Sequence, residues 1–339
     1  MESNRFTLGI VEKNLAGGAL LSGEQRTLLE RLLHGDPRAL ARAISLVEND
    51  APQAAAILSA CFPHTGGALR IGITGAPGAG KSTLVDRLAR QFLAAERKVG
   101  VVAVDPTSPF TGGAILGDRI RFQERHNDPD FYARSMATRG SLGGLALATA
   151  DVALLIEASG KDVLLIETVG VGQDEIEIAR LADVTLVVLV PGMGDDVQSL
   201  KAGVMEIADI FVVNKSDRDG ADRVEQEIRA LQSLAQVHGD WTPPVVRTIA
   251  TTGEGIERLA ASIAEMETWL RCENRLADRR AEHWQRRLDA MVRAELMRRA
   301  RRNGLSEEEL RRHAAQIASG GEDPWQLVSR LAKEALKEK

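Results

Sequence analysis

The hydrophobic pattern of the chain changes character at Leu69. Between Gly23 and Ala60 apolar residues recur at helical spacing, and the run from Gly35 to Pro37 divides this part into two helices, with Asp36 as the N-cap of the second. Residues 1–22 have weak periodicity, which is typical of a loose amino-terminal arm. We therefore expect a helical extension over residues 23–68.

From Leu69 onward, short unbroken apolar runs alternate with helical patterns. Unbroken runs predict strands that are buried on both faces, and their alternation with helices is typical of a parallel sheet between two helical layers. The expected strands are Leu69–Thr74, Val99–Val104, Val163–Glu167, Val184–Val190, Ile210–Asn214 and Val245–Ile249, and the expected helices are Ser82–Glu96, Leu142–Ala158, Asp195–Met205 and Asp222–Gln236. The sequence thus predicts a three-layer α/β domain over residues 69–264.

After residue 264 the pattern is helical again. An apolar stripe runs along one helix, which we expect to end at Asn303-Gly304; its members are Trp284, Leu288, Met291, Val292 and Leu296. The spacing of Ser306 and Glu309 predicts a capping box for the next helix. Residues 265–339 are therefore expected to form a helical region whose stripe packs on the α/β domain or on a second subunit.

Charge and composition narrow the classes of function. The chain has 339 residues with 43 basic and 48 acidic side chains, a balance that calls for neither nucleic acid nor an anionic membrane. Residues 271–302 hold eleven arginines, but five acidic residues are interleaved, which favours a solvated helix face over a nucleic-acid surface. The most apolar run, from Leu142 to Ile156, contains Asp151 and predicts a buried helix rather than a membrane span. Two cysteines without a motif fit a reducing cytoplasm.

The strongest chemical motif follows the first expected strand. The segment Gly75, Ala76, Pro77, Gly78, Ala79, Gly80, Lys81, Ser82 matches G-x-x-x-x-G-K-[ST], and Thr83 follows it. Glycines let backbone N–H groups turn toward phosphate oxygens at the start of a helix. In such a loop Lys81 reaches the β- and γ-phosphates and the Ser82 hydroxyl binds Mg²⁺. The α/β domain is therefore predicted to be a P-loop NTPase.

A second motif indicates which base is bound. Asn214, Lys215, Ser216 and Asp217 match [NT]-K-x-D directly after an expected strand. The Asp217 carboxylate would accept hydrogen bonds from guanine N1–H and its exocyclic amine, a donor pair that adenine lacks. Asn214 would position the base-binding loops, and the Lys215 stem would lie over the base. The loop of Ala250, Thr251 and Thr252 after the last strand suits backbone contacts to the guanine carbonyl.

Candidate switch and metal residues follow two other strands. Glu167-Thr168-Val169-Gly170 stands where GTPases carry Asp-x-x-Gly, so Glu167 would bind Mg²⁺ and the Gly170 N–H would contact the γ-phosphate. Asp105 ends one expected strand and Asp118 follows a glycine-rich loop, and both could approach Mg²⁺, although a turn or cap role fits each of them equally well. These patterns predict binding of GTP and GDP with Mg²⁺.

Four segments together resemble the MeaB/MMAA (ArgK-type) family of methylmalonyl-CoA mutase-associated GTPases, within the metalloenzyme-assisting class of P-loop GTPases. They are Asp105–Ser108, Gly112–Arg119, Glu167–Gln173 and Asn214–Asp217, and the resemblance covers about residues 25–270. It implies that Ser82, Asp105, Asp118 and Glu167 surround Mg²⁺, that residues 191–201 with Lys201 form an additional switch, and that the C-terminal helices build a homodimer.

The resemblance also implies a function. It implies a chaperone for an adenosylcobalamin-dependent acyl-CoA mutase, with methylmalonyl-CoA mutase as the first candidate, and this chaperone would couple GTP hydrolysis to cofactor loading and to protection of the mutase. Lys81, Glu167, Gly170 and Lys201 would then act in hydrolysis. Two alternatives stay open at this point: a kinase of a transport protein, and a GTPase that associates with nucleic acid through the arginine-rich helix.

Overall fold

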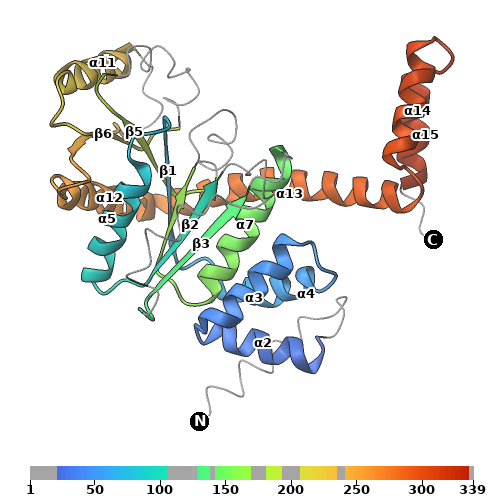
Figure 1. The fold of residues 1–339 in the computed structure, drawn as a ribbon, viewed down its shortest axis with the longest axis horizontal. Coiled ribbons are helices and arrows are strands. Elements are labelled where there is room, and N and C mark those ends of the chain that lie inside the picture. The colour runs from blue at the N-terminus through green and yellow to red at the C-terminus, as the bar shows by residue number, and fades with distance from the viewer. Residues whose placement is uncertain are drawn as a thin grey trace. The chain divides into compact units, whose positions relative to one another are not determined.

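The computed structural model describes residues 21–105, 125, 128–137, 142–168, 181–192, 207–234 and 241–335. This part of the chain forms two compact units that divide after Arg279. The first unit contains the sheet and the second contains helices only (Figure 1). The boundary that we expected at 264/265 falls within α12 (Ile256–Arg271), whose Met266 and Leu270 are buried in the core.

A seven-stranded parallel sheet is the centre of the first unit. Its order is β3-β2-β4-β1-β5-β6-β7, and each pair of neighbours runs in the same direction. The strands are β1 (Leu69–Gly75), β2 (Val99–Asp105), β3 (Phe131–Ala137), β4 (Val163–Glu167), β5 (Val184–Leu189), β6 (Ile210–Asn214) and β7 (Val245–Thr248). Six of them match the expected strands to within two residues at each end.

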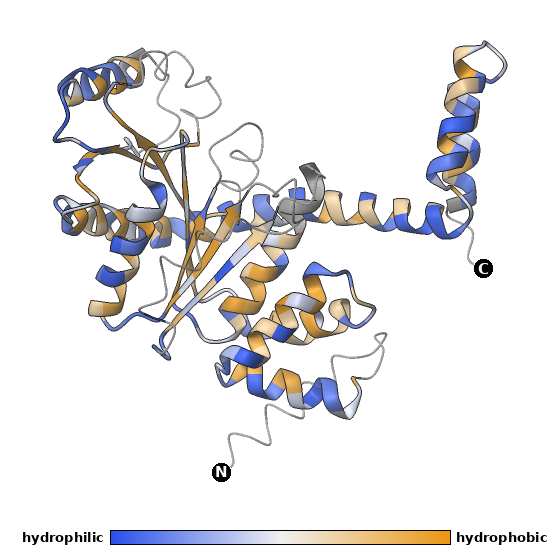
Figure 2. Ribbon diagram, in the orientation of Figure 1, coloured by the Kyte–Doolittle hydropathy of each residue, from blue (hydrophilic) through white to orange (hydrophobic). Residues whose placement is uncertain are grey.

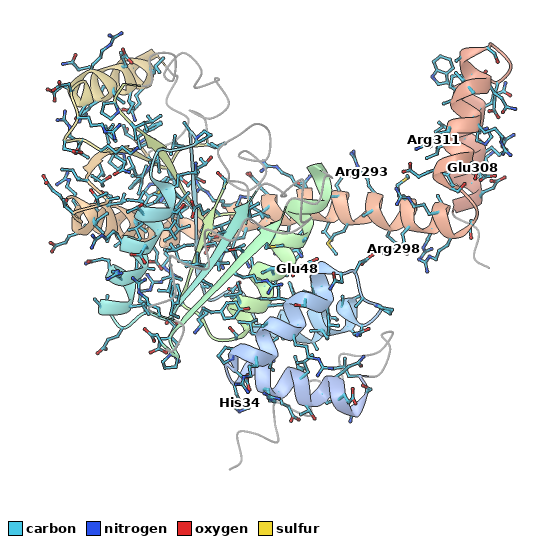
Figure 3. The ribbon with its side chains drawn as sticks, viewed as in Figure 1. His34, Glu48, Arg293, Arg298, Glu308 and Arg311 are labelled. Carbon is cyan, nitrogen blue, oxygen red and sulfur yellow. The ribbon has the colours of Figure 1, made fainter. Side chains whose placement is uncertain are left out.

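The sequence reasoning missed the edge strand β3. Its segment mixes polar and apolar residues, and Arg134 within it forms an ion pair with Glu48 (labelled in Figure 3) rather than packing in an apolar layer. An edge strand pairs with a neighbouring strand on one side only, so it tolerates polar residues at such positions. The signal that we used, an unbroken apolar run, is specific to strands that are buried on both faces.

Helices cover both faces of the sheet, so the first unit has three layers: helices, sheet and helices. Alternate residues of one strand enter different cores: Val99 and Val101 pack with α5 (Lys81–Ala94) and α12, whereas Val102 and Val104 pack with α7 (Leu142–Ala158). On the second face α11 (Ala221–Leu234) covers β5 and β6. The hydropathy colouring in Figure 2 shows this apolar interior along the strands and α7. The predicted α/β class is confirmed.

The amino-terminal extension has three helices where we expected two. They are α2 (Gly23–Leu33), α3 (Pro37–Glu48) and α4 (Ala54–Cys61), and a short 3₁₀ turn, η1 (Phe62–His64), follows them. Asp36 caps α3 as expected, since its carboxylate accepts from the backbone N–H groups of Arg38 and Ala39. The extra break lies at Asn49–Gln53, where Asp50 has φ 48° and Pro52 disfavours helix in the preceding residue. The helices α3 and α4 pack on α7.

The C-terminal helices are α13 (Arg275–Arg302), which follows a short turn η3 (Cys272–Asn274), and then α14 (Glu307–Ala318) and α15 (Pro324–Ala335). Ser306 caps α14, because its hydroxyl accepts from the Glu309 N–H at 3.1 Å. Leu305 and Ala300 pack with Leu331. Over the described ranges, no helix combines the length and the apolar character that a membrane crossing requires.

Candidate functional site

The P-loop connects β1 to α5, and its glycines are required by close packing. Gly78 and Gly80 have φ of 77° and 89°, which side chains other than hydrogen rarely allow. A Cβ on Gly80 would lie 2.5 Å from Asn214 Nδ2, and one on Gly75 would lie 2.1 Å from the Val188 carbonyl oxygen. The loop therefore forms a tight backbone cradle at the carboxyl end of the central strand, where parallel sheets place their ligands.

Lys81 lies inside this cradle. Its side chain is 6% exposed, and its ammonium donates to the carbonyl oxygens of Gly75 at 2.6 Å and Ala76 at 3.0 Å. The next residues, Ser82 and Thr83, lie in the first turn of α5, which begins at Lys81, and the N-terminal end of a helix carries the positive end of its dipole. A positive charge and a helix N-terminus thus meet at the mouth of the loop, which is the environment that phosphate oxygens need.

An oxygen-donor pair lies beside the cradle. Ser82 Oγ is 2.5 Å from Glu167 Oε1, and Glu167 ends β4, which pairs with β1 so that Ile73 and Glu167 are in register. The Glu167 side chain is 7% exposed. Hydroxyl and carboxylate oxygens are the donors that Mg²⁺ prefers, so this pair fits the predicted metal. Thr168 follows and donates its hydroxyl to Thr74 Oγ1 at 3.1 Å, which fixes the end of β4 against β1.

Asn214 connects the P-loop to the loop after β7. Its side-chain amide donates to the Ala79 carbonyl at 2.8 Å, and its carbonyl oxygen accepts from Thr248 Oγ1 and from the Ala250 N–H, each at 3.1 Å. The residue is 1% exposed, so all three contacts are shielded from water. One buried side chain therefore connects the P-loop with the loop after β7, and positioning of the base by these loops stays a prediction.

Lys215 and Asp217 extend from the same turn. Lys215 has φ 55°, and its ammonium donates to the Gly78 carbonyl at 2.7 Å, so its stem crosses the P-loop. Asp217 is exposed. The Ser216 N–H donates to the Thr248 carbonyl at 3.2 Å, which brings the turn against the end of β7. A base lying along the Lys215 stem would have the Asp217 carboxylate within the same turn.

The third loop comprises Ala250, Thr251 and Thr252. Ala250 is buried, and the two threonines are exposed. Gly255 closes the loop with φ 79°, where a Cβ would lie 2.1 Å from the Arg247 carbonyl oxygen. Because the Ala250 N–H donates to Asn214 Oδ1 at 3.1 Å, this loop lies beside Asn214.

Four of the predicted site positions lie outside what the structure describes. They are Asp118, Gly170 and Lys201, together with the side chain of Asp105, whose backbone ends β2. The expected helix over residues 195–205 falls in the same category. Their proposed roles remain predictions from the sequence.

The sequence reasoning also missed residues that build the site. Arg87 of α5 donates from Nε to the Ala250 carbonyl at 3.0 Å and from Nη2 to the Thr251 carbonyl, and the Thr248 hydroxyl binds Asn214. Thr248 could have been found from its position at the carboxyl end of β7. Arg87 has no local signal, because an arginine on a helix near the surface is ordinary.

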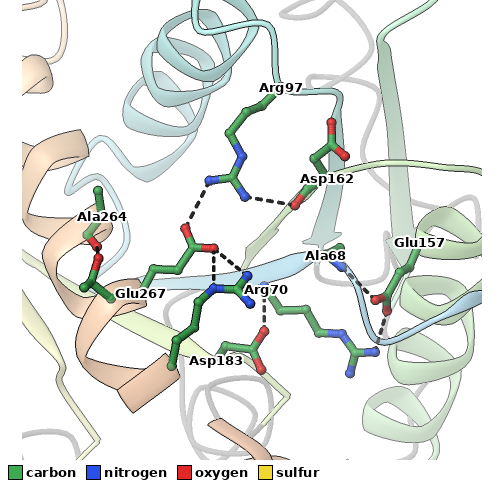
Figure 4. Close-up of polar contacts among 10 residues, drawn as sticks. Ala68, Arg70, Arg97, Glu157, Asp162, Asp183, Ala264 and Glu267 are labelled. Carbon is green, nitrogen blue, oxygen red and sulfur yellow. Dashed lines mark hydrogen bonds and ion pairs between the residues drawn. The ribbon is translucent and has the colours of Figure 1, made fainter.

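Several ion pairs lie at the opposite end of the strands from the P-loop (Figure 4). At the amino ends of the strands, Arg70 pairs with Glu157 at 2.7 Å and Arg97 with Glu267 at 3.2 Å. The Arg70 N–H also donates to Asp183 Oδ2 at 2.9 Å. The P-loop, Glu167 and Asn214 therefore lie at the carboxyl ends of the strands, and these ion pairs lie at the amino ends.

Comparison with known proteins agrees with this geometry. A family model described as methylmalonyl-CoA mutase-associated GTPase MeaB matches residues 40–304. The chain is 52% identical over 256 residues to a putative GTPase of Pyrococcus horikoshii, covering 75% of this chain and 81% of that protein. It is 39% identical over 256 residues to the GTPase ArgK of Escherichia coli, covering 73% and 77%.

The fold comparison gives the same answer. The crystal structure of a LAO/AO transport system kinase aligns with a TM-score of 0.70 and 27% identity, covering 93% of this chain and 99% of that one. The family model spans most of the sequence, and the sequence relatives are called GTPases. The chain belongs to the MeaB family of methylmalonyl-CoA mutase-associated GTPases.

Proposed function

We propose that this GTPase binds GTP and GDP together with Mg²⁺ at the carboxyl edge of its sheet, and that it acts as a chaperone for an adenosylcobalamin-dependent acyl-CoA mutase. The observation that carries the nucleotide assignment is the position of Asn214, which is hydrogen-bonded to both the P-loop and the Ala250 loop. The mutase partner is supported by the description of the matching family.

The site residues divide the work of hydrolysis. Backbone N–H groups of the P-loop and the start of α5 would hold the phosphates, and the Lys81 ammonium would neutralise charge on the β- and γ-oxygens. Ser82 and Glu167 would hold Mg²⁺, which draws negative charge from the phosphate oxygens when bound. Asp105 and Asp118 are proposed as further metal ligands, directly or through water. The Gly170 N–H would sense the γ-phosphate.

The base is proposed to be guanine. Asp217 would accept from guanine N1–H and the 2-amino group, and the Ala250–Thr252 loop would face the 6-oxo group. Incubation with γ-labelled GTP tests the reaction: release of free phosphate supports a GTPase, whereas label bound to protein would support the kinase alternative. Lys81→Ala should abolish phosphate release, and Glu167→Gln should raise the Mg²⁺ concentration that hydrolysis needs. Near-normal turnover and Mg²⁺ dependence in both variants would refute the site.

A homodimer through the C-terminal helices is part of the proposal. On α13 the apolar side chains Leu288, Met291 and Val292 are 54%, 44% and 56% exposed in the single chain. A contiguous exposed apolar face on a helix is typical of a protein interface.

The arginines of α13 favour a solvent-exposed helix face over a nucleic-acid surface. Arg293 pairs with Asp289 at 2.9 Å, and Arg299 pairs with Glu295 at 3.0 Å (Arg293 is labelled in Figure 3).

The chaperone role would couple hydrolysis to the mutase. Residues 191–201, with Lys201, are proposed as the segment that signals between the nucleotide and the partner. That coupling would load adenosylcobalamin onto the mutase and would protect the mutase from inactivation. Methylmalonyl-, isobutyryl- and other acyl-CoA mutases share the adenosylcobalamin chemistry, and each of them is a candidate partner.

A further inference from the structure

The loop after β7 is held from two sides. On its inner side Asn214 Oδ1 accepts from the Ala250 N–H at 3.1 Å. On its outer side Arg87 donates to two consecutive carbonyls, those of Ala250 and Thr251. Arg87 reaches the loop from α5, the helix that begins with the P-loop lysine, and α5 packs beside α12, which follows the loop (Figure 1).

Binding two consecutive carbonyls fixes two peptide planes. In a trans peptide the carbonyl of one residue and the N–H of the next lie in the same plane and point in opposite directions. The guanidinium is planar and presents its donors in a rigid fork, so it fixes both planes together. By holding the Ala250 carbonyl, Arg87 therefore sets the direction of the Thr251 N–H, which points away from the guanidinium.

The Thr251 amide is the donor that remains available. The Thr252 and Gly253 N–H groups both donate to the Ile249 carbonyl, at 3.1 and 2.9 Å, and the Ala250 N–H is directed at Asn214. Across the residues that the structure describes, the Thr251 N–H donates to no acceptor. An amide that is oriented but not used inside its own loop is suited to an acceptor on a ligand.

We infer that Arg87 is a positioning residue for base selection, and that it aims the Thr251 N–H at the oxygen on carbon 6 of the purine. This rests on the proposed guanine site. Recognition of the base then has two parts: Asp217 binds the groups at positions 1 and 2 of guanine, and the loop held by Arg87 binds the oxygen at position 6. A 6-amino group would present a donor to the Thr251 donor and would be rejected.

The experiment compares GDP with two nucleoside diphosphates, each of which differs from GDP at one position of the purine base. GDP is the reference, IDP lacks the 2-amino group, and 6-thio-GDP replaces the 6-oxygen by sulfur, a weak acceptor. Dissociation constants are measured for the full-length chain and for Arg87→Met, which keeps the stem but removes the donors. Arg87→Lys tests rescue, because an ammonium can still reach a carbonyl. Arg90→Met is the matched control on the same helix, where Arg90 pairs with Asp86 at 3.0 Å.

The full-length chain should prefer GDP over 6-thio-GDP. Arg87→Met should lower that preference about five- to tenfold, the range expected for one hydrogen bond from an oriented donor, and should leave the preference for GDP over IDP unchanged. Arg87→Lys should restore part of the loss, and Arg90→Met should change neither ratio. A merely structural role for Arg87 would weaken all three nucleotides equally, and that result would overturn the inference.

Two further outcomes separate this inference from the proposed function. If the unmodified chain does not distinguish GDP from 6-thio-GDP, or if Arg87→Met leaves that ratio unchanged, the inference is wrong while a guanine site still stands. If the unmodified chain shows no preference for GDP over ADP, the proposed guanine site itself fails, and the inference fails with it. Thermal unfolding of each variant shows whether the fold is intact before the ratios are compared.

Discussion

The side-chain amide of Asn214 donates to the carbonyl of Ala79 at 2.8 Å. This single bond connects the end of β6 with the P-loop that follows β1, across the intervening strand β5. Since Asn214 also accepts from the loop after β7, the three loops of the proposed nucleotide site share one buried residue. Base and phosphate recognition are therefore expected to depend on each other.

The first prediction tests this connection. Asn214→Asp keeps the shape but places an acceptor opposite the Ala79 carbonyl, so it should lower the free energy of unfolding by about 2–3 kcal/mol and weaken GDP binding. Denaturant unfolding and nucleotide titration measure the two effects. Asn303→Asp is the control, because Asn303 donates to the Glu334 carbonyl in an exposed place. Equal, small effects of both changes would show that Asn214 has no special role.

The second prediction concerns base choice. Asp217→Asn should lose affinity for guanine nucleotides and gain affinity for xanthine nucleotides, because the amide donates to the xanthine 2-oxo group where the carboxylate accepted from the guanine amine. One misplaced pair of this kind costs about 2–4 kcal/mol, which is roughly a thirtyfold to thousandfold change in affinity. Competition between GDP and XDP measures it. Full retention of GDP affinity would show that Asp217 does not contact the base.

The third prediction concerns the ion pair of Arg279 with the buried Asp209, where Arg279 Nη1 lies 2.8 Å from Asp209 Oδ2. Arg279→Met should cost about 3–5 kcal/mol at neutral pH, because it leaves the Asp209 carboxylate buried without a cation. Arg271→Met removes an exposed pair with Glu267 and should cost less than about 1 kcal/mol. Denaturant unfolding measures both.

The cost of Arg279→Met should shrink as the pH falls. Burial raises the pKa of Asp209, and Arg279 opposes that rise, so removing Arg279 raises the pKa further. A carboxyl with a raised pKa in the folded state takes up a proton there before it does so in the unfolded chain, and the folded variant therefore gains stability on acidification. A cost that stays constant between pH 7 and pH 5 would contradict a charged Asp209 as its cause.

The fourth prediction concerns assembly. We expect the full-length chain to be a homodimer at micromolar concentration, and Leu288→Glu with Val292→Glu to dissociate it, because both side chains lie on the exposed apolar face of α13. Met297→Glu is the control, since Met297 is 46% exposed but falls on the other side of the helix by its spacing. Light scattering distinguishes the states. A monomeric parent chain, or equal dissociation by the control, would refute the proposed interface.

The sequence was sufficient for those parts of the fold whose pattern is local. The strands β4, β5 and β6 could be predicted because they are buried along their whole length and read as apolar runs, and α7 because its run from Leu142 to Ala158 is long and apolar. The edge strand β3 could not, since its polar residues contact elements far away, as Arg134 contacts Glu48. Local signals cannot reveal a residue whose role depends on a distant partner.

The same division holds within the candidate site. Glycines, Lys81 and the Asn214–Asp217 turn could be predicted because phosphate and base recognition demand fixed spacing along the chain. Arg87 could not, because it acts on carbonyls more than 160 residues away, with a separation of 163 between Arg87 and Ala250. The break at Asn49–Gln53 contains Pro52, which is a local signal for the end of a helix.

The last prediction concerns the rate of hydrolysis. In the sequence Val171 follows Gly170, where Ras-type GTPases carry the glutamine that orients water, and the nearest glutamine is Gln173. Hydrolysis by the chain alone should therefore be slow, on the order of 10⁻⁴ to 10⁻² per second. A partner that places one charged group, such as Lys201, near the phosphates could supply about 3–4 kcal/mol to the transition state.

Single-turnover GTP hydrolysis, with and without an adenosylcobalamin-dependent acyl-CoA mutase, tests the central proposal most directly. The predicted result is slow turnover alone, a rate increase of about a hundredfold to a thousandfold with the cognate mutase, and loss of that increase in Lys201→Ala. Fast turnover by the isolated protein, or no stimulation by methylmalonyl-, isobutyryl- or any other acyl-CoA mutase, would contradict the chaperone proposal.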